Sequence, residues 1–433
     1  MTQSNSDPRN SDAVLGGNSP APHQGAILGG IEGIQQKLNN PDLAIRLDGL
    51  DQAWSYGKAG LPILQQALSD RSKTIRRRAR WLLRQPKDTQ TLLPPQPLWN
   101  LTERLAGYAG YRSEHVTCFA NRTVDEGFKP GDALHNPSQV AYAFRCDFNN
   151  TLKMMTKRFN ALLDTPGSEQ IEALVFGMWD DDEGICTGDS SSQRFVEWLT
   201  SLSDRLPNLK ALFIGDITYE ECEISWLVQS DMSPILRAYP RLEVLQVRGG
   251  MGLKFMPIAT SAGTARHESL KALILETGGL SQETLLQIYQ WDFPALEHLE
   301  LWFGSENYGG DCWEQDLAPI LDELKFPNLT YLGLRNSQFT DELIDRLVQW
   351  LLLSGVQVLD LSLGTLSDEG AAKLLECSEL RDLEILNVSE SYLSGAMIDQ
   401  LQSLGIQVIA NDQRLESEDY DDVDAERYCA VAE

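Results

Sequence analysis

The sequence lacks the residue patterns on which most enzymes and metal proteins depend. Its five histidines never occur at metal-ligand spacing, and its seven cysteines include no C-x-x-C pair, which argues against zinc and against a disulfide framework. It contains no G-x-S-x-G run and no glycine-rich run followed by Lys-Ser or Lys-Thr, so neither a hydrolase nucleophile nor a phosphate loop is indicated. We therefore expect no catalytic residue, no metal site, no cofactor and no enzymatic activity.

Long apolar runs and an excess of basic residues are missing too. No window approaches about 18 apolar residues, and the polar residues 1–18 hold no apolar stretch, so neither a membrane span nor a signal peptide is predicted. Of the 433 residues, 63 are Asp or Glu and 36 are Lys or Arg, for a net charge of -27. Such a surface repels nucleic-acid phosphates and anionic lipids. We expect a cytoplasmic protein that binds neither nucleic acid nor membrane.

The front of the chain contains a repeat of helical type. Residues 30–46 align with residues 60–76, so that Gly30 matches Gly60 and Arg46 matches Arg76. Each copy indicates a helix, a polar break and a second helix. This pattern is similar to a pair of short HEAT-type repeats.

The last helix of this pair predicts two different faces. Ile75, Ala79 and Leu82 share an apolar face, by their helical spacing. A row of arginines lies on another face: Arg76, Arg80 and Arg84. The row either binds an anionic ligand or docks on the acidic remainder of the chain, and the sequence leaves both hypotheses open.

From about residue 170 the template L-x-x-L-x-L recurs. Its second leucine is, in order, Leu174, Leu212, Leu245, Leu273, Leu299, Leu332, Leu359 and Leu386. From Leu212 onward the copies are 26 to 33 residues apart, which is the period of leucine-rich repeats. Helical runs that begin at Ser281, Thr340 and Ser367 separate the strands, and each hydroxyl suits an N-cap.

The predicted fold class is α/β. We expect a leucine-rich-repeat solenoid, with a parallel β ribbon inside and helices outside, preceded by an α+β cap and a short all-α HEAT-like helical pair. The predicted divisions are a disordered tail (1–22), HEAT-like helical repeats (23–90), an α+β N-terminal cap (91–169), the solenoid (170–412) and an acidic C-terminal segment (413–433). The apolar residues 428–432 are expected to return and seal the last repeat.

Several runs in this array resemble a family of bacterial cytosolic leucine-rich-repeat proteins. They are residues 215–226, 248–250, 276–280, 299–302, 334–337 and 359–366, together with the Arg427-Tyr428 ending. The resemblance covers about residues 120–433. Some relatives carry a WGR domain where this chain has HEAT-like repeats. The resemblance implies the fold and a bacterial setting, but no reaction and no catalytic residue.

The concave side of the ribbon supplies the main candidate site. The residue after the last core leucine of each strand is out of phase with the buried set, so it is predicted to project there. On neighbouring strands these residues are Arg248, Glu276, Trp302 and Arg335. Arg and Trp side by side are typical of a binding hot spot. Alternatively, Arg248 pairs with Glu276 and Arg335 stacks on Trp302, which only neutralises the ribbon.

An insert at residues 216–226 is a second candidate. It carries Asp216, Tyr219 and Glu220 beside Trp226. It is either a binding loop on the edge of the solenoid or a packed insert whose aromatic residues fill a gap, the latter being favoured for Trp226.

These features favour a non-catalytic scaffold for protein–protein interaction. In this hypothesis the concave face of the solenoid binds a protein or peptide. The alternative is an accessory factor, or a lyase-like protein, for attachment of a tetrapyrrole (bilin), because short HEAT-like repeats also occur in bilin lyases.

Overall fold

A computed structural model describes most of the chain. It covers residues 30–67, 114–145, 152–180, 188–257, 265–321, 325–353, 356–415 and 427–431, with single positions between 70 and 82 and at 185. The chain divides into two compact units, residues 1–96 and 97–433. No helix in these ranges is long and apolar enough to cross a membrane.

The N-terminal unit consists of short helices around a small apolar core. They are α1 (Gly30–Leu38), α2 (Leu43–Ser55), the 3-10 turn η1 (Gly57–Ala59) and α3 (Leu61–Ala67). Ile75, Ala79 and Leu82 are buried in this core, as predicted from their spacing. The helices lie where the sequence predicts them, while their HEAT character stays a prediction. Arg76, Arg80 and Arg84 lie outside the described residues.

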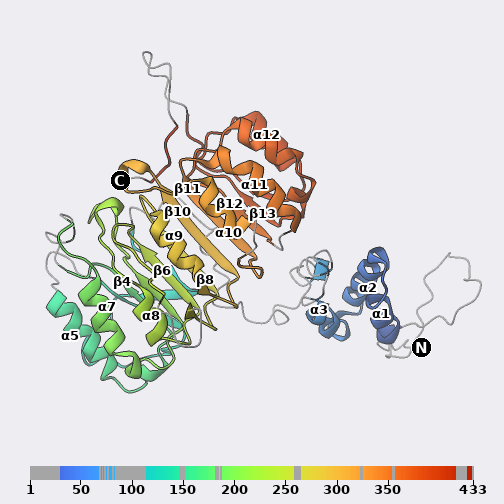
Figure 1. The fold of residues 1–433 in the computed structure, drawn as a ribbon. Helices are drawn as coiled ribbons and strands as arrows, with labels where there is room; N and C mark the ends of the chain where they lie inside the picture. The colour runs from blue at the N-terminus through green and yellow to red at the C-terminus, as the bar shows by residue number, and fades with distance from the viewer. Residues whose placement is uncertain are drawn as a thin grey trace, which may run out of the picture. The chain divides into compact units, whose positions relative to one another are not determined.

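The C-terminal unit is built on one long sheet (Figure 1). Its strands, in spatial order, are β1 (Cys118–Phe119), β2 (Arg122–Asp125), β3 (Val140–Phe144), β4 (Ala173–Phe176), β5 (Ala211–Ile214), β6 (Val244–Arg248), β8 (Ala272–Glu276), β10 (His298–Gly304), β11 (Tyr331–Ser337), β12 (Val358–Asp360), β13 (Ile385–Asn387) and β14 (Gln407–Ile409). β1 and β2 are antiparallel, and all other neighbours are parallel. β7 (Ala265–Arg266) and β9 (Trp291–Asp292) form a small separate pair.

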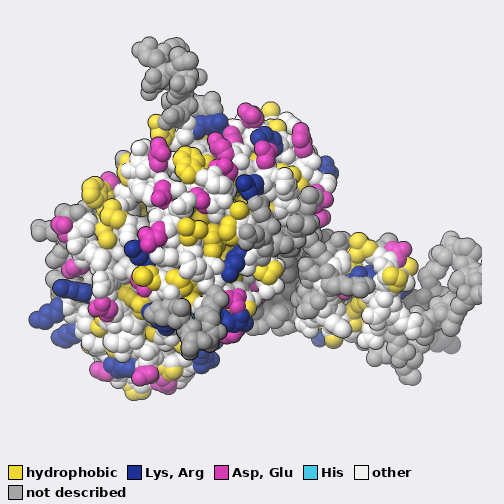
Figure 2. Space-filling model, in the orientation of Figure 1, with side chains coloured by type: hydrophobic (Ala, Val, Ile, Leu, Met, Phe, Trp, Pro, Cys, Tyr) yellow, Lys and Arg dark blue, Asp and Glu magenta, His cyan; other side chains and the backbone are white. Residues whose placement is uncertain are grey.

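Helices pack along one face of this sheet (Figure 1). They are α5 (Leu152–Leu163), α7 (Gln193–Ser201), α8 (Ser233–Ala238), α9 (Gln282–Tyr289), α10 (Ala318–Leu321), α11 (Thr340–Leu353), α12 (Asp368–Glu376) and α13 (Gly395–Gln402). The predicted N-caps are confirmed for α9 and α12, where the hydroxyls of Ser281 and Ser367 accept from backbone N–H groups of the first turn. The face visible in Figure 2 mixes hydrophobic, acidic and basic side chains.

The predicted leucine ladder is confirmed. Leu174, Leu212 and Leu245 are direct partners across β4, β5 and β6. The ladder continues through the remaining predicted leucines, Leu273, Leu299, Leu332, Leu359 and Leu386. These side chains share one core with the helices. The parallel ribbon with outer helices is therefore leucine-rich-repeat-like, as expected, and Tyr142 on β3 extends its ladder toward the N-terminus.

The other face of the ribbon, here called the inner face, changes character along the sheet. From β3 to β8 it is mainly apolar, with Ala141, Val175, Phe213 and Ile274 in a second buried cluster. From β10 to β13 the same position carries a charged or polar residue on three of four strands: Glu300, Asp360 and Asn387, with Gly333 between them. Both parts of the inner face are buried.

Candidate functional site

The four residues predicted to line a concave binding face lie next to one another as expected. Arg248 on β6 pairs in register with Glu276 on β8, and Trp302 on β10 pairs with Arg335 on β11. Their predicted exposure is wrong, however. Between 0% and 5% of each residue is accessible to solvent, so this row does not offer a surface to a partner.

The first pair is held by a compact set of buried bonds. Arg248 Nε donates to Glu276 Oε2 at 2.8 Å, and Gln246 donates to the other carboxylate oxygen at 2.9 Å. Arg248 also donates to the Ile217 carbonyl, at 2.7 Å. A buried carboxylate needs such partners, because an uncompensated charge in the interior is strongly destabilising.

The second pair belongs to a larger network that is centred on Glu300. Arg335 Nη1 donates to Glu300 Oε1 at 2.7 Å, and the Trp302 indole N–H donates to the same oxygen at 2.8 Å. The Arg335 guanidinium lies 4.8 Å from the centre of the Trp302 ring. Tyr331 links the network to Asp360, to which its hydroxyl donates at 2.9 Å.

The structure therefore favours the second hypothesis for this row: Arg248 pairs with Glu276, and Arg335 stacks on Trp302. The central residue, Glu300, was not predicted. Glu300 could have been predicted from the sequence, because it lies between the core leucines Leu299 and Leu301 and so must face the inner side. An acid at such a position indicates a buried partner.

Segments from elsewhere in the chain help to cover this face. Phe119 lies 5.9 Å from Phe213 of β5, between ring centres. The N–H of Val116 donates to Asp216, immediately after β5, at 3.3 Å.

The predicted insert loop divides into a buried and an exposed part. Asp216 is fully buried and accepts from Arg145 Nη2 at 2.6 Å. His115 is a further charged neighbour, with Nδ1 at 3.6 Å. His115 Nε2 in turn lies 3.3 Å from Glu221. Asp216 is therefore a structural anchor rather than a binding residue.

This cluster raises the pKa of His115. Burial alone lowers the pKa of His115, but the nearby carboxylates of Asp216 and Glu221 outweigh burial and raise the pKa to about 9. Burial likewise works against ionisation of Asp216, yet His115, Arg248 and Arg145 hold the pKa of that carboxyl below its usual value. His115 thus forms a charged, partly buried cluster with Asp216 and Glu221, which holds the loop after β5 in place.

The exposed part of the insert contains the predicted residues Tyr219 and Glu220, and also Trp226. Tyr219 is 55% exposed and Trp226 is 47% exposed. The interpretation of Trp226 as a packed residue is therefore wrong. Its indole N–H donates to Glu223 at 3.1 Å, which orients the ring in solvent.

Trp226 opens onto an apolar pocket at the edge of the sheet. The loops that follow β5, β6, β8, β10, β11 and β12 form this edge, which we call the rim. A cavity of about 570 Å³ lies between Trp226, Met251 and Tyr308. Met251 is 49% exposed. Lys254 and Glu283, which also line it, form an exposed pair at 3.6 Å.

A protruding loop, residues 305–310, separates this pocket from the next. It folds back over Gly279, whose place no other residue could take, because an added Cβ would lie 2.3 Å from the Tyr308 carbonyl oxygen. Gly309 completes the turn with a φ of 88°. Glycine is favoured at both points, by close approach and by a left-handed conformation.

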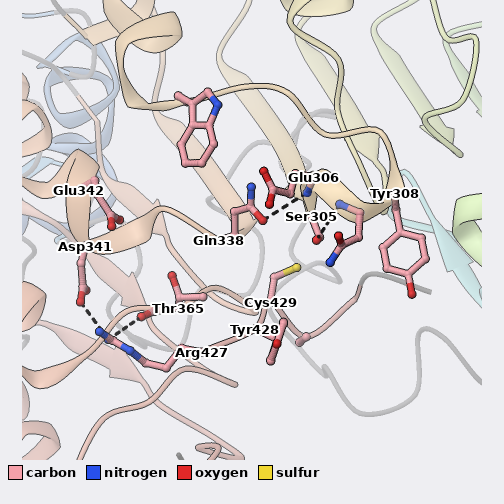
Figure 3. Close-up of a pocket in the computed structure, with 13 residues that line it drawn as sticks. Ser305, Glu306, Tyr308, Gln338, Asp341, Glu342, Thr365, Arg427, Tyr428 and Cys429 are labelled. Carbon is pink, nitrogen blue, oxygen red and sulfur yellow. Dashed lines mark hydrogen bonds and ion pairs between the residues drawn. The ribbon is translucent and has the colours of Figure 1, made fainter. Parts of the chain in front are cut away.

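The second rim pocket is polar and acidic. Its volume is about 780 Å³, and it shares Asn307 and Tyr308 with the first pocket. In Figure 3, Glu306 and Ser305 lie on one side of this pocket, and Asp341 and Arg427 lie on the other. Asp341 and Arg427 form an ion pair of 2.9 Å with each other. Residues 427–430 of the C-terminal segment form part of its wall.

The sequence predicts that the C-terminal segment seals the last repeat, but the segment also contacts earlier repeats. The Tyr428 N–H donates to the Tyr392 hydroxyl after β13, and the Ala430 N–H donates to the Leu363 carbonyl after β12. The Val431 N–H donates to Asn336 at the end of β11. Residues 427–431 thus run back along the rim across three repeats.

Among the described residues, no group of three or more His, Cys, Asp or Glu side chains is arranged to hold a metal ion. The rim pockets contain side chains suited to recognition: indole, thioether, phenol and carboxylate groups around open cavities.

Comparison with known proteins finds structural similarity but gives no activity. No protein-family model and no curated protein sequence matches the chain. A solved Bacteroides fragilis protein is 27% identical with a TM-score of 0.53, over 63% of this chain and 74% of that one. An internalin from Listeria monocytogenes is 14% identical with a TM-score of 0.32, over 63% and 67% of the two chains, and is too distant to inform on this chain. The leucine-rich-repeat-like character of the fold rests on the parallel ribbon itself.

Proposed function

We propose that the chain is a non-catalytic scaffold that binds a partner protein at the rim, with the apolar pocket beside Trp226 and Met251 as the main contact. The observation that carries this proposal is the pairing of two large, half-exposed side chains with an open cavity. Exposed apolar patches around a pocket mark interaction sites in soluble proteins. Trp is enriched among residues that dominate binding energy, and Met adapts to different partners.

The geometry of the rim adds to this proposal. The loops of successive repeats lie side by side there, so a partner can contact several repeats at once. The two pockets share Asn307 and Tyr308, and together they offer an apolar and an acidic surface. This arrangement suits a segment with an apolar side chain next to a basic one.

We propose the remaining parts of the organisation on sequence grounds. Residues 23–90 act as HEAT-like repeats, and the α+β segment before residue 170 caps the apolar end of the solenoid, as solenoids require. The absence of a reaction, the kinship with bacterial leucine-rich-repeat proteins and the cytoplasmic location also belong to this proposal. The alternative role in bilin attachment gains nothing from the rim, and it stays a prediction from the helical repeats.

Site-specific photo-cross-linking tests the proposal. A benzophenone amino acid replaces Trp226 or Met251, and in a control it replaces Leu286, which is 47% exposed on α9. We expect one discrete adduct at both rim positions and none at the control position. Equal cross-linking at all three positions, or none at the rim, contradicts a rim site.

The partner identified in this way then permits a quantitative measurement. Trp226→Ala should weaken its binding by about 30-fold, since truncation of an aromatic anchor costs about 2 kcal/mol. Leu286→Ala is the matched control and should leave the affinity unchanged. An unchanged affinity for Trp226→Ala overturns the assignment of this pocket.

A further inference from the structure

Residues 427–431 lie on a part of the rim formed by Asn336, Leu363 and Tyr392, which we call the trough. The trough binds the main chain of this segment. The side-chain amide of Asn336 binds both sides of Val431: its oxygen accepts from the Val431 N–H at 2.8 Å, and its nitrogen donates to the Val431 carbonyl. One repeat further on, the Leu363 carbonyl accepts from the Ala430 N–H at 2.7 Å. Main-chain bonds of this kind give affinity for an extended peptide with little regard to its sequence.

The trough is built by the same turn in three successive repeats. Asn336 at the end of β11, Leu363 after β12 and Glu390 after β13 occupy equivalent positions, and all have a positive φ, of 51°, 67° and 49°. Such a conformation is costly for a leucine. It places the Leu363 carbonyl against the bound segment, so the strained turn serves recognition.

Side chains of the segment alternate between exposed and buried, as in an extended strand. Arg427 pairs with Asp341 at 2.9 Å and donates to the Thr365 carbonyl at 3.0 Å. Tyr428 is 58% exposed, whereas Cys429 and Val431 are 7% and 2% exposed. The trough thus selects a basic residue at the first position and small or branched apolar residues at the third and fifth.

The acidic residues directly before the segment match the charge of the adjoining pocket poorly. Glu306 and Glu342 line the adjoining pocket, are exposed, and have no cationic partner among the described residues. Directly before Arg427, residues 416–426 hold seven acids in eleven positions. Acids that precede a segment docked on an acidic rim repel it, whereas basic residues there would be attracted.

We propose that this trough is a binding site for an extended, basic segment of a partner protein, which enters by displacing residues 427–431. The segment carries an arginine in the place of Arg427, further basic residues before it and a small aliphatic residue in the place of Val431. This inference rests on the proposed scaffold function but uses a part of the rim remote in sequence from Trp226. Its test therefore involves neither Trp226 nor Met251.

The first step of the test releases the segment in the full-length chain. Val431→Pro removes the N–H that Asn336 accepts and leaves all trough residues unchanged. Release is measured at Cys429, where burial raises the thiol pKa to about 11 and slows alkylation. We expect alkylation of Cys429, followed by peptide mass spectrometry, to be at least about tenfold faster in the variant. Continued protection of Cys429 overturns the role assigned to Asn336.

The second step measures binding of the labelled peptide KKRYSAVA, in which serine replaces the cysteine. The tethered segment competes at an effective concentration of the order of millimolar, so Val431→Pro should bind this peptide at least about tenfold more tightly than the wild type. Replacement of the two lysines by glutamates should weaken binding, and added salt should reduce the difference. If Cys429 is released but the peptide does not bind, the proposal is wrong.

Two N-methylated peptides supply a matched control. Methylation of the valine nitrogen removes the bond to Asn336 and should abolish binding. Methylation of the serine nitrogen, which corresponds to Cys429, removes no bond present among the described residues, and binding should persist. Equal effects of the two methyl groups overturn the proposed register of the peptide.

Discussion

Trp302 on the inner face and Trp226 on the rim differ in burial, and this difference separates a structural surface of the ribbon from an exposed one. Trp302 is 1% exposed and is bonded to Glu300, whereas Trp226 is 47% exposed beside an open pocket. Trp302 lies on β10 and Trp226 lies in the loop after β5, and both strands belong to the same ladder. The inner face has become a second core, and the rim retains the exposed groups. The concave side of a repeat ribbon is therefore a binding surface only where no other part of the chain covers it.

The largest expected effect is the loss of the buried indole. Trp302→Ala should lower the free energy of unfolding by about 4 kcal/mol, because it leaves a cavity and removes a partner of Glu300. Chemical denaturation measures this change. A loss below about 1 kcal/mol, as is typical of surface sites, would place Trp302 at the surface and remove the distinction between the two faces.

A somewhat smaller loss is expected when the buried ion pair is broken. Arg335→Met should cost about 3 kcal/mol, since Glu300 is left charged in the interior while keeping its bond from Trp302. Lys373→Met is the matched control, because the pair of Lys373 with Asp345 is exposed and measures 3.5 Å; it should cost about 0–0.5 kcal/mol. Equal losses in the two variants would argue against a buried network.

A third expected effect is a pH dependence of the unfolding free energy, caused by His115 beside the loop after β5. The pKa of His115 is raised from 6.5 to about 9 in the folded chain. The folded state thus binds this proton more tightly, so the stabilisation is complete below about pH 6.5 and is lost as the pH rises through 9. Partial exposure reduces its size, and we expect a loss of about 1–2 kcal/mol over this range.

His115→Gln isolates this contribution. Denaturation curves of the variant, compared with the wild type between these pH values, should lack that part of the pH dependence. If the two proteins keep parallel stability profiles, His115 is not the group that titrates.

The smallest effect is expected at the rim. Trp226→Ala should change the unfolding free energy by less than about 0.5 kcal/mol, as substitutions at exposed sites do. Thermal denaturation of the variant beside Trp302→Ala gives the sharpest contrast, since both remove an indole. A loss near that of Trp302→Ala would return Trp226 to the core and leave the apolar pocket without its exposed anchor.

The leucine-bearing face could be predicted from the sequence because its information is local. Each copy of L-x-x-L-x-L places its leucines on one side of a strand, and the register of Leu174 with Leu212 and beyond follows from the repeat. The helix starts at Ser281 and Ser367 could be predicted for the same reason, since an N-cap depends on neighbouring residues.

Burial of the inner face could not be predicted, because it depends on segments that are distant in sequence. Phe119 contacts Phe213 of β5, and Val116 bonds to Asp216, which is 100 residues away. The same limitation affected Trp226, whose exposure depends on how the neighbouring loops pack. Glu300 and Asp360 were predictable in principle, since a carboxylate between two core leucines needs a buried partner.

Hydroxyl-radical footprinting with mass spectrometry tests the contrast between the two faces most directly, because one sample reports on each tryptophan. We expect Trp226 to be oxidised at least about tenfold faster than Trp302, in line with their burial. The partner identified by cross-linking should then protect Trp226 and leave Trp302 unchanged. Rapid oxidation of Trp302 in the free protein, or its selective protection by the partner, would contradict the account and return the binding site to the inner face.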